Sequence, residues 1–374
     1  MKSVGIISEY NPFHNGHRYQ IAKAKEMSKA DCVVAVMSGN YVQRGDVSIY
    51  SKYERAKSAI LGGVDIVFEL PAYFSLKSAE GFARGAVSML KALGVDAISF
   101  GAECENLSLL KETAEILKAE KGDFKKILKE GLKSGKSFAG ARSDALSHVF
   151  KQGEEIVLKP NNILATEYLA AMDYYSYSPE IYPVKRVGTG HDSDEVSGEF
   201  SSASNIRKML LKGEDTEKFA FSLPKDKPVF LKDFEKLLLY SAITISCNPS
   251  GGSDGLYERI VSANKESLET LLMSVKTKRF ALSRIKRYLV NLMLQNNLPE
   301  NREPSYLRIL ALNSKGATFI KENAEKFTLP VISKPSQIPE NDEIFALERR
   351  GSLIRALIAS DTKDDIYMSP LFIK

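Results

Sequence analysis

The chain has 374 residues, a length that favours two domains and allows a core to be buried without disulfides or metals. Its 52 basic and 47 acidic side chains give a net charge of +5, and a composition that is 44% hydrophobic and 26% charged excludes a disordered or fibrous chain. The three cysteines, Cys32, Cys104 and Cys247, lie far apart and in no Cys/His cluster, so neither a disulfide framework nor a metal site is predicted.

Two apolar runs bear on the cellular location. Val4–Ile7 is too short for the core of a secretory signal, and Leu237–Ile245 falls well short of the roughly 18 apolar residues that a membrane span requires. We therefore expect no export signal and no membrane segment. Together with the unpaired cysteines, this favours a location in the reducing cytoplasm.

Short β-rich runs alternate with amphipathic helical patterns through the first half of the chain. The alternation is typical of an α/β fold in which a doubly wound parallel sheet is connected by right-handed crossover helices. Strands are predicted at Val4–Ile7, Cys32–Met37, Ile66–Leu70, Ala97–Phe100 and Ile181–Val187, and helices at Gly16–Lys29, Lys52–Leu61, Phe82–Leu93, Asn162–Met172 and from Ser204 onward.

The character of the sequence changes at residues 213–228, a charged segment with two prolines that is typical of a connector. We place a domain boundary there, with an α/β domain at residues 1–220 and a helix-rich, partly basic domain at residues 221–374. The predicted elements of the second domain are helices at Leu231–Ile245, Tyr257–Asn264, Ser283–Gln295 and Ile344–Ile358, and short strands at Leu307–Leu312 and Leu329–Ile332.

The segment that carries chemistry is Glu9-Tyr10-Asn11-Pro12-Phe13-His14-Asn15-Gly16-His17, between the first predicted strand and the first predicted helix. A helix N-terminus at the carboxyl end of a parallel strand attracts phosphate through its free N–H groups. His14 and His17 are three residues apart, so in a helix both imidazoles project to one side, toward the same anion. The pair indicates phosphoryl chemistry; the competing interpretation is two surface or capping histidines without a ligand.

Two motifs resemble those of a known superfamily. His14-Asn15-Gly16-His17 resembles the HxGH motif of the nucleotidylyltransferases, which share their ATP site with class I aminoacyl-tRNA synthetases. The resemblance implies a Rossmann-like domain in which both histidines hold the phosphates during in-line attack. Ser201-Ser202-Ala203-Ser204-Asn205-Ile206-Arg207 resembles the ISSTxIR-type motif, which implies that Ser202, Ser204 and Arg207 bind pyrophosphate. Alone, a serine-rich helix cap is more often structural.

A narrower resemblance covers most of the chain. The motif segments above, together with residues 37–46, 63–71, 159–164 and 278–280, resemble the bacterial tRNA(Met) cytidine acetate ligases. The resemblance implies that ATP, with Mg²⁺, activates acetate as acetyl-adenylate and releases pyrophosphate. The acetyl group then passes to the wobble cytidine of elongator tRNA(Met), giving acetylcytidine and AMP. No membrane and no obligate protein partner are implied.

The same resemblance implies a set of ATP-binding residues. Outside that context, Gly101 would be a turn, Asn162 a helix cap and Arg186 a solvated charge. Ala165 and Ser51 depart from the family pattern, in which a glycine and an acidic residue are expected. The implied catalytic residues are His14 and His17, and the implied ATP-binding residues are Ile7, Ser8, Glu9, Tyr10, Asn11, Pro12, Phe13, His14, Asn15, Gly16, His17, Arg18, Tyr19, Gln20, Gly101, Asn162, Arg186, Val187, Ser202, Ser204 and Arg207.

A basic stripe in the second domain is the candidate RNA surface. Basic side chains there can contact phosphates, and the interleaved Phe280 and Tyr288 can stack on unpaired bases. The competing interpretation is a solvated helix face with both rings in the core. A second basic group, Arg44, Lys52 and Arg55, either contacts phosphate or only increases solubility. The stripe consists of Lys276, Lys278, Arg279, Arg284, Lys286 and Arg287, with no acidic residue between them.

Two other functions remain open at the level of sequence. A small-metabolite adenylyltransferase would need the same HxGH motif, although such enzymes usually lack a long basic second domain. An RNA-binding protein with a relic nucleotide site would not need both motif histidines, which are intact here.

Overall fold

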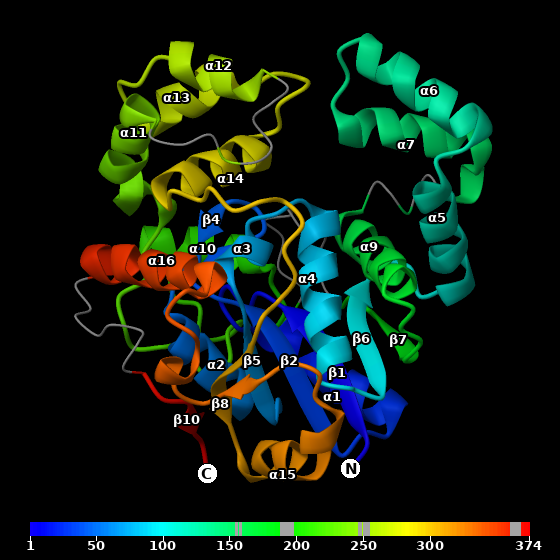
Figure 1. Cartoon of the computed structure of the whole chain (residues 1–374), viewed down its shortest axis with the longest axis vertical. Coiled ribbons are helices and arrows are strands. Elements are labelled where there is room, and N and C mark those ends of the chain that lie inside the picture. Colours follow the sequence, from blue (N-terminus) through cyan, green and yellow to red (C-terminus); the bar gives the residue numbers. More distant parts are fainter. Residues whose placement is uncertain (154–155, 157–158, 188–197, 246–248, 250–254, 360–367) are drawn as a thin grey trace.

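The protein is described here by a computed structural model that covers residues 1–153, 156, 159–187, 198–245, 249, 255–359 and 368–374; Cys247 lies outside the described residues. A sheet with strand order β10-β8-β5-β2-β1-β6-β7 runs through the molecule, and β9 (Val331–Ile332) pairs with β8. Helices surround this sheet (Figure 1). The predicted α/β class is confirmed.

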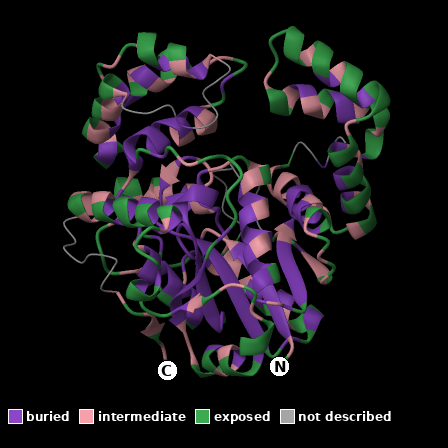
Figure 2. Ribbon diagram, viewed as in Figure 1, coloured by how far each residue is buried: buried purple, intermediate pink, exposed green. Residues whose placement is uncertain are grey.

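The centre of the sheet is parallel and comes from the first half of the chain. Its strands are β1 (Ser3–Ser8), β2 (Cys32–Ser38), β5 (Ile66–Leu70), β6 (Ala97–Ala102) and β7 (Glu180–Lys185). Successive residues of β2 enter two separate cores, Val34 and Val36 one and Val33 and Ala35 the other. Continuous apolar runs therefore form these strands because both sheet faces are covered (Figure 2).

The predicted crossover helices are present within a few residues of their expected ends. They are α1 (Asn15–Ser28), α2 (Lys52–Leu61), α4 (Ala79–Ala92) and α9 (Pro160–Tyr174), and α10 (Ala203–Lys212) follows β7. Two short elements between β2 and β5 carry no periodic signal in the sequence: the hairpin strands β3 (Tyr41–Val42) and β4 (Asp46–Val47). The turn α3 (Ala72–Ser75) follows β5.

The C-terminal part of the chain is helix-rich, as expected, but it also completes the central sheet. The strand β8 (Leu307–Leu312) pairs antiparallel with β5, and β10 (Leu371–Phe372) pairs with β8. The sheet therefore crosses the boundary expected near residue 220. The helices of this part are α11 (Glu235–Thr244), α12 (Leu256–Ser262), α13 (Leu268–Val275), α14 (Leu282–Met293), α15 (Ser314–Asn323) and α16 (Glu343–Ala359).

Two groups of helices stand beyond one end of the sheet (Figure 1). One comprises α11 to α14; the other comprises α5 (Leu107–Ala119), α6 (Gly122–Lys133) and α7 (Phe138–Val149), whose own small core includes Phe124 and Leu146. The N-terminus lies at the opposite end, so β1 runs toward these groups and delivers the residues that follow it to their base. No helix in the described ranges combines the length and apolar character needed to cross a membrane.

Candidate functional site: a paired-histidine helix terminus

The two motif histidines stack on each other at the start of α1. Their ring centroids are 3.7 Å apart with an interplanar angle of 24°. His14 is the N-cap residue, and its Nδ1 accepts a hydrogen bond from the N–H of Gly16 at 3.1 Å. The Nδ1 of His17 accepts from the N–H of His14 at 3.3 Å. The expectation that both rings project to one side of the helix start is confirmed.

These backbone bonds assign the tautomer of each ring. An imidazole whose Nδ1 accepts a hydrogen bond carries its proton on Nε2 when neutral. Burial, followed by the neighbouring His14 and Arg186, lowers the pKa of His17 well below 6.5. At neutral pH, His17 is therefore a neutral donor through Nε2–H. Both rings can thus direct Nε2–H donors at one anion above the helix terminus, whose free N–H groups add to the attraction.

The lowered pKa of His17 predicts a pH dependence of stability. The unfolded chain binds a proton at His17 at higher pH than the folded chain does, so this stability contribution is complete above about pH 6.5 and is lost as the pH falls. We expect the wild-type protein to lose more free energy of unfolding between about pH 8 and about pH 5 than a His17→Gln variant, which cannot titrate there. Urea unfolding at both pH values measures this; equal losses would contradict it.

The wall beside the histidines is aromatic. The ring of Tyr10 meets His17 edge-on at 4.9 Å between centroids, and Phe13 lies 5.7 Å from the same ring. The hydroxyls of Ser8 and Tyr10 are buried and lie near each other.

Gly101, at the end of β6, lies beside the same helix terminus. A Cβ atom built on Gly101 would lie 3.7 Å from the side chains of Arg186 and Gln20, which is ordinary van der Waals contact, so Gly101 packs beside both residues. Arg186 also acts electrostatically on His17 and donates to Asn161 at 3.0 Å. The structure therefore brings these predicted residues together around one space.

Asn162 has a structural role that the sequence pattern only partly indicates. Its Oδ1 accepts from the N–H groups of Glu103 and Cys104 at 2.9 and 3.0 Å, and its own N–H donates to the Glu103 carboxylate at 3.0 Å. Asn162 thus fixes the loop after β6 beside Gly101.

Val187, which was also predicted to bind ATP, follows Arg186 in the chain, and its side chain is 43% exposed.

The second motif docks directly on the first. Ser202 is the N-cap of α10, and its Oγ accepts from the N–H of Asn205 at 3.0 Å. Arg207 donates through Nη1 to the main-chain carbonyl of Asn11 at 2.6 Å and through Nη2 to the hydroxyl of Ser204 at 3.3 Å. A hydroxyl-lined helix start with an arginine therefore lies against the histidine loop, although the two motifs are far apart in the sequence.

Other residues of the predicted ATP-binding segment hold that segment in place. The amide of Asn15 donates to the carbonyls of Glu199 and Lys218, both at 3.0 Å, and the guanidinium of Arg18 lies 4.6 Å from the ring centre of Phe221. These contacts connect the start of α1 to the chain on either side of α10.

Two members of the basic group Arg44, Lys52 and Arg55 do not have the exposed position that was expected of them. Lys52 and Arg55 are each only 1% exposed, so they neither reach RNA nor increase solubility. Their partners come from distant parts of the chain, which is why the local sequence shows two basic residues on a helix and nothing more. Both partner sets are described below.

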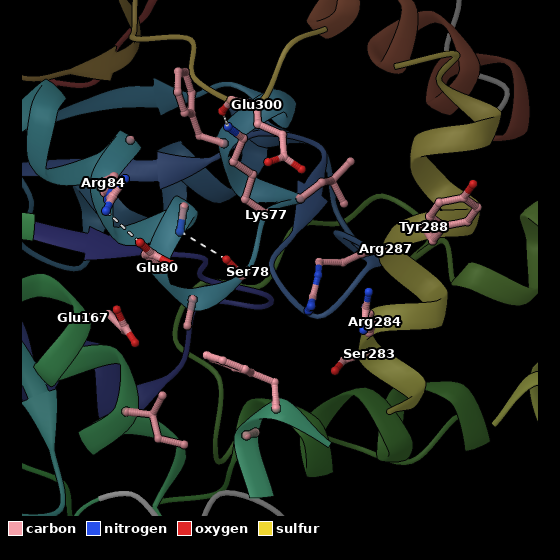
Figure 3. A pocket seen from close by; sticks show the side chains of 18 of the residues that line it. Lys77, Ser78, Glu80, Arg84, Glu167, Ser283, Arg284, Arg287, Tyr288 and Glu300 are labelled. Atoms are coloured by element: carbon pink, nitrogen blue, oxygen red, sulfur yellow. Dashed lines mark hydrogen bonds and ion pairs between the residues drawn. The ribbon is translucent and has the colours of Figure 1, made fainter. Parts of the chain in front are cut away.

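The predicted basic stripe borders a cleft of about 830 Å³. Arg84 on α4 faces Arg284 and Arg287 on α14 across it (Figure 3), and Arg142 and Arg279 also line it. The histidine pair does not line this cleft.

The expectation that Phe280 and Tyr288 stack on bases is wrong. The two rings are only 4% and 3% exposed and belong to the main core: Tyr288 lies on the inward face of α14, and Phe280 lies just before that helix. The buried Tyr288 still lines the cleft, as do Phe138 and Tyr174, which are 52% and 55% exposed.

A short relay, which sequence reasoning missed, joins the cleft to the histidine loop. Arg287 donates to the carbonyl of Gln43 at 3.1 Å, and the N–H of Gln43 donates to the Glu9 carboxylate at 2.7 Å. Gly45, at φ +73°, packs so tightly on α14 that a Cβ atom would lie 2.2 Å from the backbone nitrogen of Arg287. The hairpin between β3 and β4 therefore spans the distance between the two features.

The parallel sheet and the histidine pair at its first helix define a nucleotidyl transferase of the HIGH class. In agreement, the family model described as HIGH Nucleotidyl Transferase matches residues 1–367. The tRNA(Met) cytidine acetate ligase of Caldicellulosiruptor saccharolyticus is 40% identical, covering 96% of this chain and 94% of that protein. The corresponding ligase of Thermoanaerobacter sp. is 41% identical over 91% and 90%. The chain belongs to the family of tRNA(Met) cytidine acetate ligases.

Solved structures agree with this assignment. Thermotoga maritima TmcAL without ligand has a TM-score of 0.88 and 32% identity over the whole of both chains. The form of that protein bound with alpha-thio ATP has a TM-score of 0.86 and 31% identity, again over both whole chains. The family resemblance and the fold predicted from the motifs are thereby confirmed.

Proposed function

We propose that this protein is an ATP-dependent ligase that activates acetate as acetyl-adenylate and transfers the acetyl group to the wobble cytidine of elongator tRNA(Met). The observation that carries the proposal is the stacked pair His14 and His17 at the N-terminus of α1, in a chain whose relatives are named for this reaction. The T. maritima relative bound with an ATP analogue supports ATP as the nucleotide.

In the first step, a carboxylate oxygen of acetate attacks the α-phosphorus of ATP and pyrophosphate leaves. The Nε2–H donors of His14 and His17 stabilise the negative charge that develops on the phosphate oxygens. Ser202, Ser204 and Arg207, which dock against the same loop, hold the departing pyrophosphate. Positioning and electrostatics carry the rate, and no covalent enzyme intermediate forms.

Mg²⁺ enters this proposal as part of the substrate, because it commonly binds phosphate oxygens and keeps several of its waters. Within the described residues no group of three or more His, Cys, Asp or Glu side chains is arranged to hold a metal ion.

In the second step, the exocyclic amine of the cytidine attacks the acetyl carbonyl carbon and forms a C–N bond. The C–O bond between the acetyl group and the adenylate phosphate then breaks, and AMP leaves with that oxygen. The amine loses one proton to solvent. The base must be unstacked from the anticodon loop to reach the activated acetate. The cleft supports an RNA approach, because Arg284 and Arg287 of α14 line it and the relay through Gln43 ends at the histidine loop.

Charge reversal at Arg279, an exposed member of the basic stripe, tests the RNA surface. We expect Arg279→Glu to weaken tRNA binding about tenfold and to reduce the slope of its salt dependence by about one, while acetate activation stays intact. The matched control is Lys321→Glu, the same charge change on α15 at the opposite end of the sheet. Filter binding of tRNA across a salt series measures both variants; equal affinities would move the RNA surface elsewhere.

Carboxylate-dependent ATP–pyrophosphate exchange tests the proposed function. Acetate is compared with no acid and with longer acids, and bulk tRNA is then added to look for acetylated cytidine. Exchange that needs acetate, followed by label in tRNA, supports the ligase. Exchange with a phosphorylated metabolite instead would favour a small-metabolite adenylyltransferase, and tRNA binding without exchange would favour a binding protein. Because its substrates are ATP and tRNA, we propose that the protein acts in the cytoplasm, without an obligate protein partner.

A further inference from the structure

Arg55, on α2, lies at the meeting point of the two central strands. It is 1% exposed. Its Nη1 donates to the carbonyl of Glu9, its Nη2 to those of Ser38 at 3.0 Å and Gly39, and its Nε to that of Tyr50 at 3.2 Å. Each of these acceptors is a main-chain carbonyl, and three of them belong to the carboxyl ends of β1 and β2. One guanidinium therefore ties the end of β1, from which the histidine loop begins, to the end of β2.

The Glu9 carbonyl is the group through which Arg55 reaches the histidines. It belongs to the peptide that enters Tyr10, whose φ of +45° lies in the left-handed region. A tyrosine adopts that conformation only where its surroundings fix it. The Tyr10 ring in turn meets the ring of His17 edge-on at 4.9 Å. A rotation of the Glu9–Tyr10 peptide would therefore move the surface on which His17 rests.

The charge and shape of arginine suit this role. Burial, followed by the neighbouring Arg355, lowers the pKa of Arg55 to about 9, so the guanidinium stays charged at neutral pH. Charged donors form the stronger hydrogen bonds to carbonyls. The planar fork of arginine also holds several acceptors in fixed directions, which a lysine ammonium on a flexible stem cannot do.

We propose that Arg55 is a positioning residue for acetate activation, holding the Glu9–Tyr10 peptide so that His17 is placed to meet the phosphates of ATP. This inference rests on the proposed function. Arg55 touches no substrate in it; its effect passes through Glu9 and Tyr10 to His17.

Two matched lysine substitutions test the role. Arg308, on β8, is also 1% exposed, and its guanidinium binds the Glu69 carboxylate at 3.3 Å and the Tyr53 hydroxyl at 2.6 Å. Arg55→Lys and Arg308→Lys each remove one buried guanidinium. Exchange is measured below the melting temperatures of both variants. We expect Arg55→Lys to lower kcat of acetate-dependent exchange about 10- to 100-fold, with a smaller change in KM for ATP. We expect Arg308→Lys to keep kcat within about threefold of the wild-type value.

A second readout does not depend on activity. Histidine side-chain NMR follows the titration of His17, whose pKa we expect to move toward its ordinary value in Arg55→Lys but not in Arg308→Lys. Arg55→Gln, whose amide reaches fewer carbonyls, serves as a second variant if the lysine does not fold. Unchanged kcat together with an unchanged His17 titration in a folded Arg55 variant would overturn the positioning role. Absence of acetate-dependent exchange in the wild-type protein would instead count against the proposed function, and the NMR comparison would still judge Arg55.

Discussion

Replacing His17 with alanine is expected to abolish acetate-dependent ATP–pyrophosphate exchange, a loss of at least about 10²–10³-fold. The substitution removes an Nε2–H donor that is already oriented by the bond between its Nδ1 and the N–H of His14. It creates no charge and leaves the sheet untouched, so the circular dichroism spectrum and the affinity for tRNA are expected to stay close to those of the wild-type protein.

The matched control is His148→Ala, which removes an exposed imidazole from α7, outside the paired-histidine site. Exchange is measured with labelled pyrophosphate at saturating ATP and acetate. A His17→Ala enzyme that activates acetate at the rate of the His148→Ala control would remove His17 from the mechanism.

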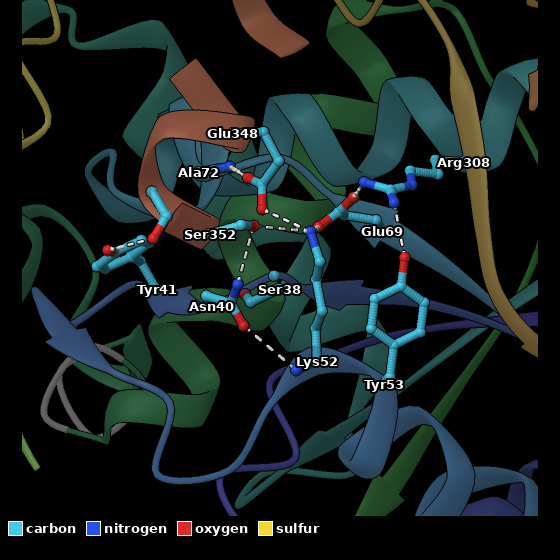
Figure 4. Close-up of polar contacts among 12 residues, drawn as sticks. Ser38, Asn40, Tyr41, Lys52, Tyr53, Glu69, Ala72, Arg308, Glu348 and Ser352 are labelled. Atoms are coloured by element: carbon cyan, nitrogen blue, oxygen red, sulfur yellow. Dashed lines mark hydrogen bonds and ion pairs between the residues drawn. The ribbon is translucent and has the colours of Figure 1, made fainter. Parts of the chain in front are cut away.

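The second large effect concerns stability rather than chemistry. The Nζ of Lys52 is buried with the carboxylates of Glu69 and Glu348, the latter at 3.0 Å, and reaches the Ser352 hydroxyl at 3.2 Å (Figure 4). Without this ammonium, the carboxylates of Glu69 and Glu348 remain close together in the core. Their proximity is evident at Gly39, where an added Cβ atom would lie 2.9 Å from an oxygen of each. We expect Lys52→Met to lower the free energy of unfolding by about 3–5 kcal/mol.

Lys57→Met is the control. Lys57 lies on the same helix, but its side chain is exposed and its ion pair with Glu54 is long, at 3.9 Å. Surface pairs of this kind contribute about 0–1 kcal/mol. Urea unfolding followed by circular dichroism compares the two variants. If Lys52→Met loses no more stability than Lys57→Met, the buried cluster does not hold α16 and β5 together.

The parallel strands and the histidine site could be predicted because their signals are local. Apolar runs such as Cys32–Ser38 specify a strand by themselves, and the spacing of His14 and His17 already places both rings on one side of a helix. The motif resemblance implies that Arg207 binds pyrophosphate, whereas its hydrogen bond to the Asn11 carbonyl is visible only in the structure.

The errors arose where the partner of a residue lies far away in the chain. Lys52 and Arg55 look like surface charges on a helix because Glu348 and the Glu9 carbonyl, which bury them, are remote in sequence. Phe280 and Tyr288 share a basic stretch, yet both rings lie in the core, Tyr288 on the inward face of α14 and Phe280 just before that helix. Such placements depend on tertiary packing, which periodicity and composition do not encode.

The antiparallel pairing of β8 with β5 affects how the chain can be divided and made. A ribosome releases β5 long before β8, so until residues 307–312 emerge the β5 edge has unpaired N–H and C=O groups on an otherwise finished sheet. A shortened chain that stops near residue 220 would keep that open edge permanently and would tend to self-associate through it. The strands β8 and β10 therefore complete one edge of the central sheet, and the sheet cannot be fully assembled before they have been synthesised.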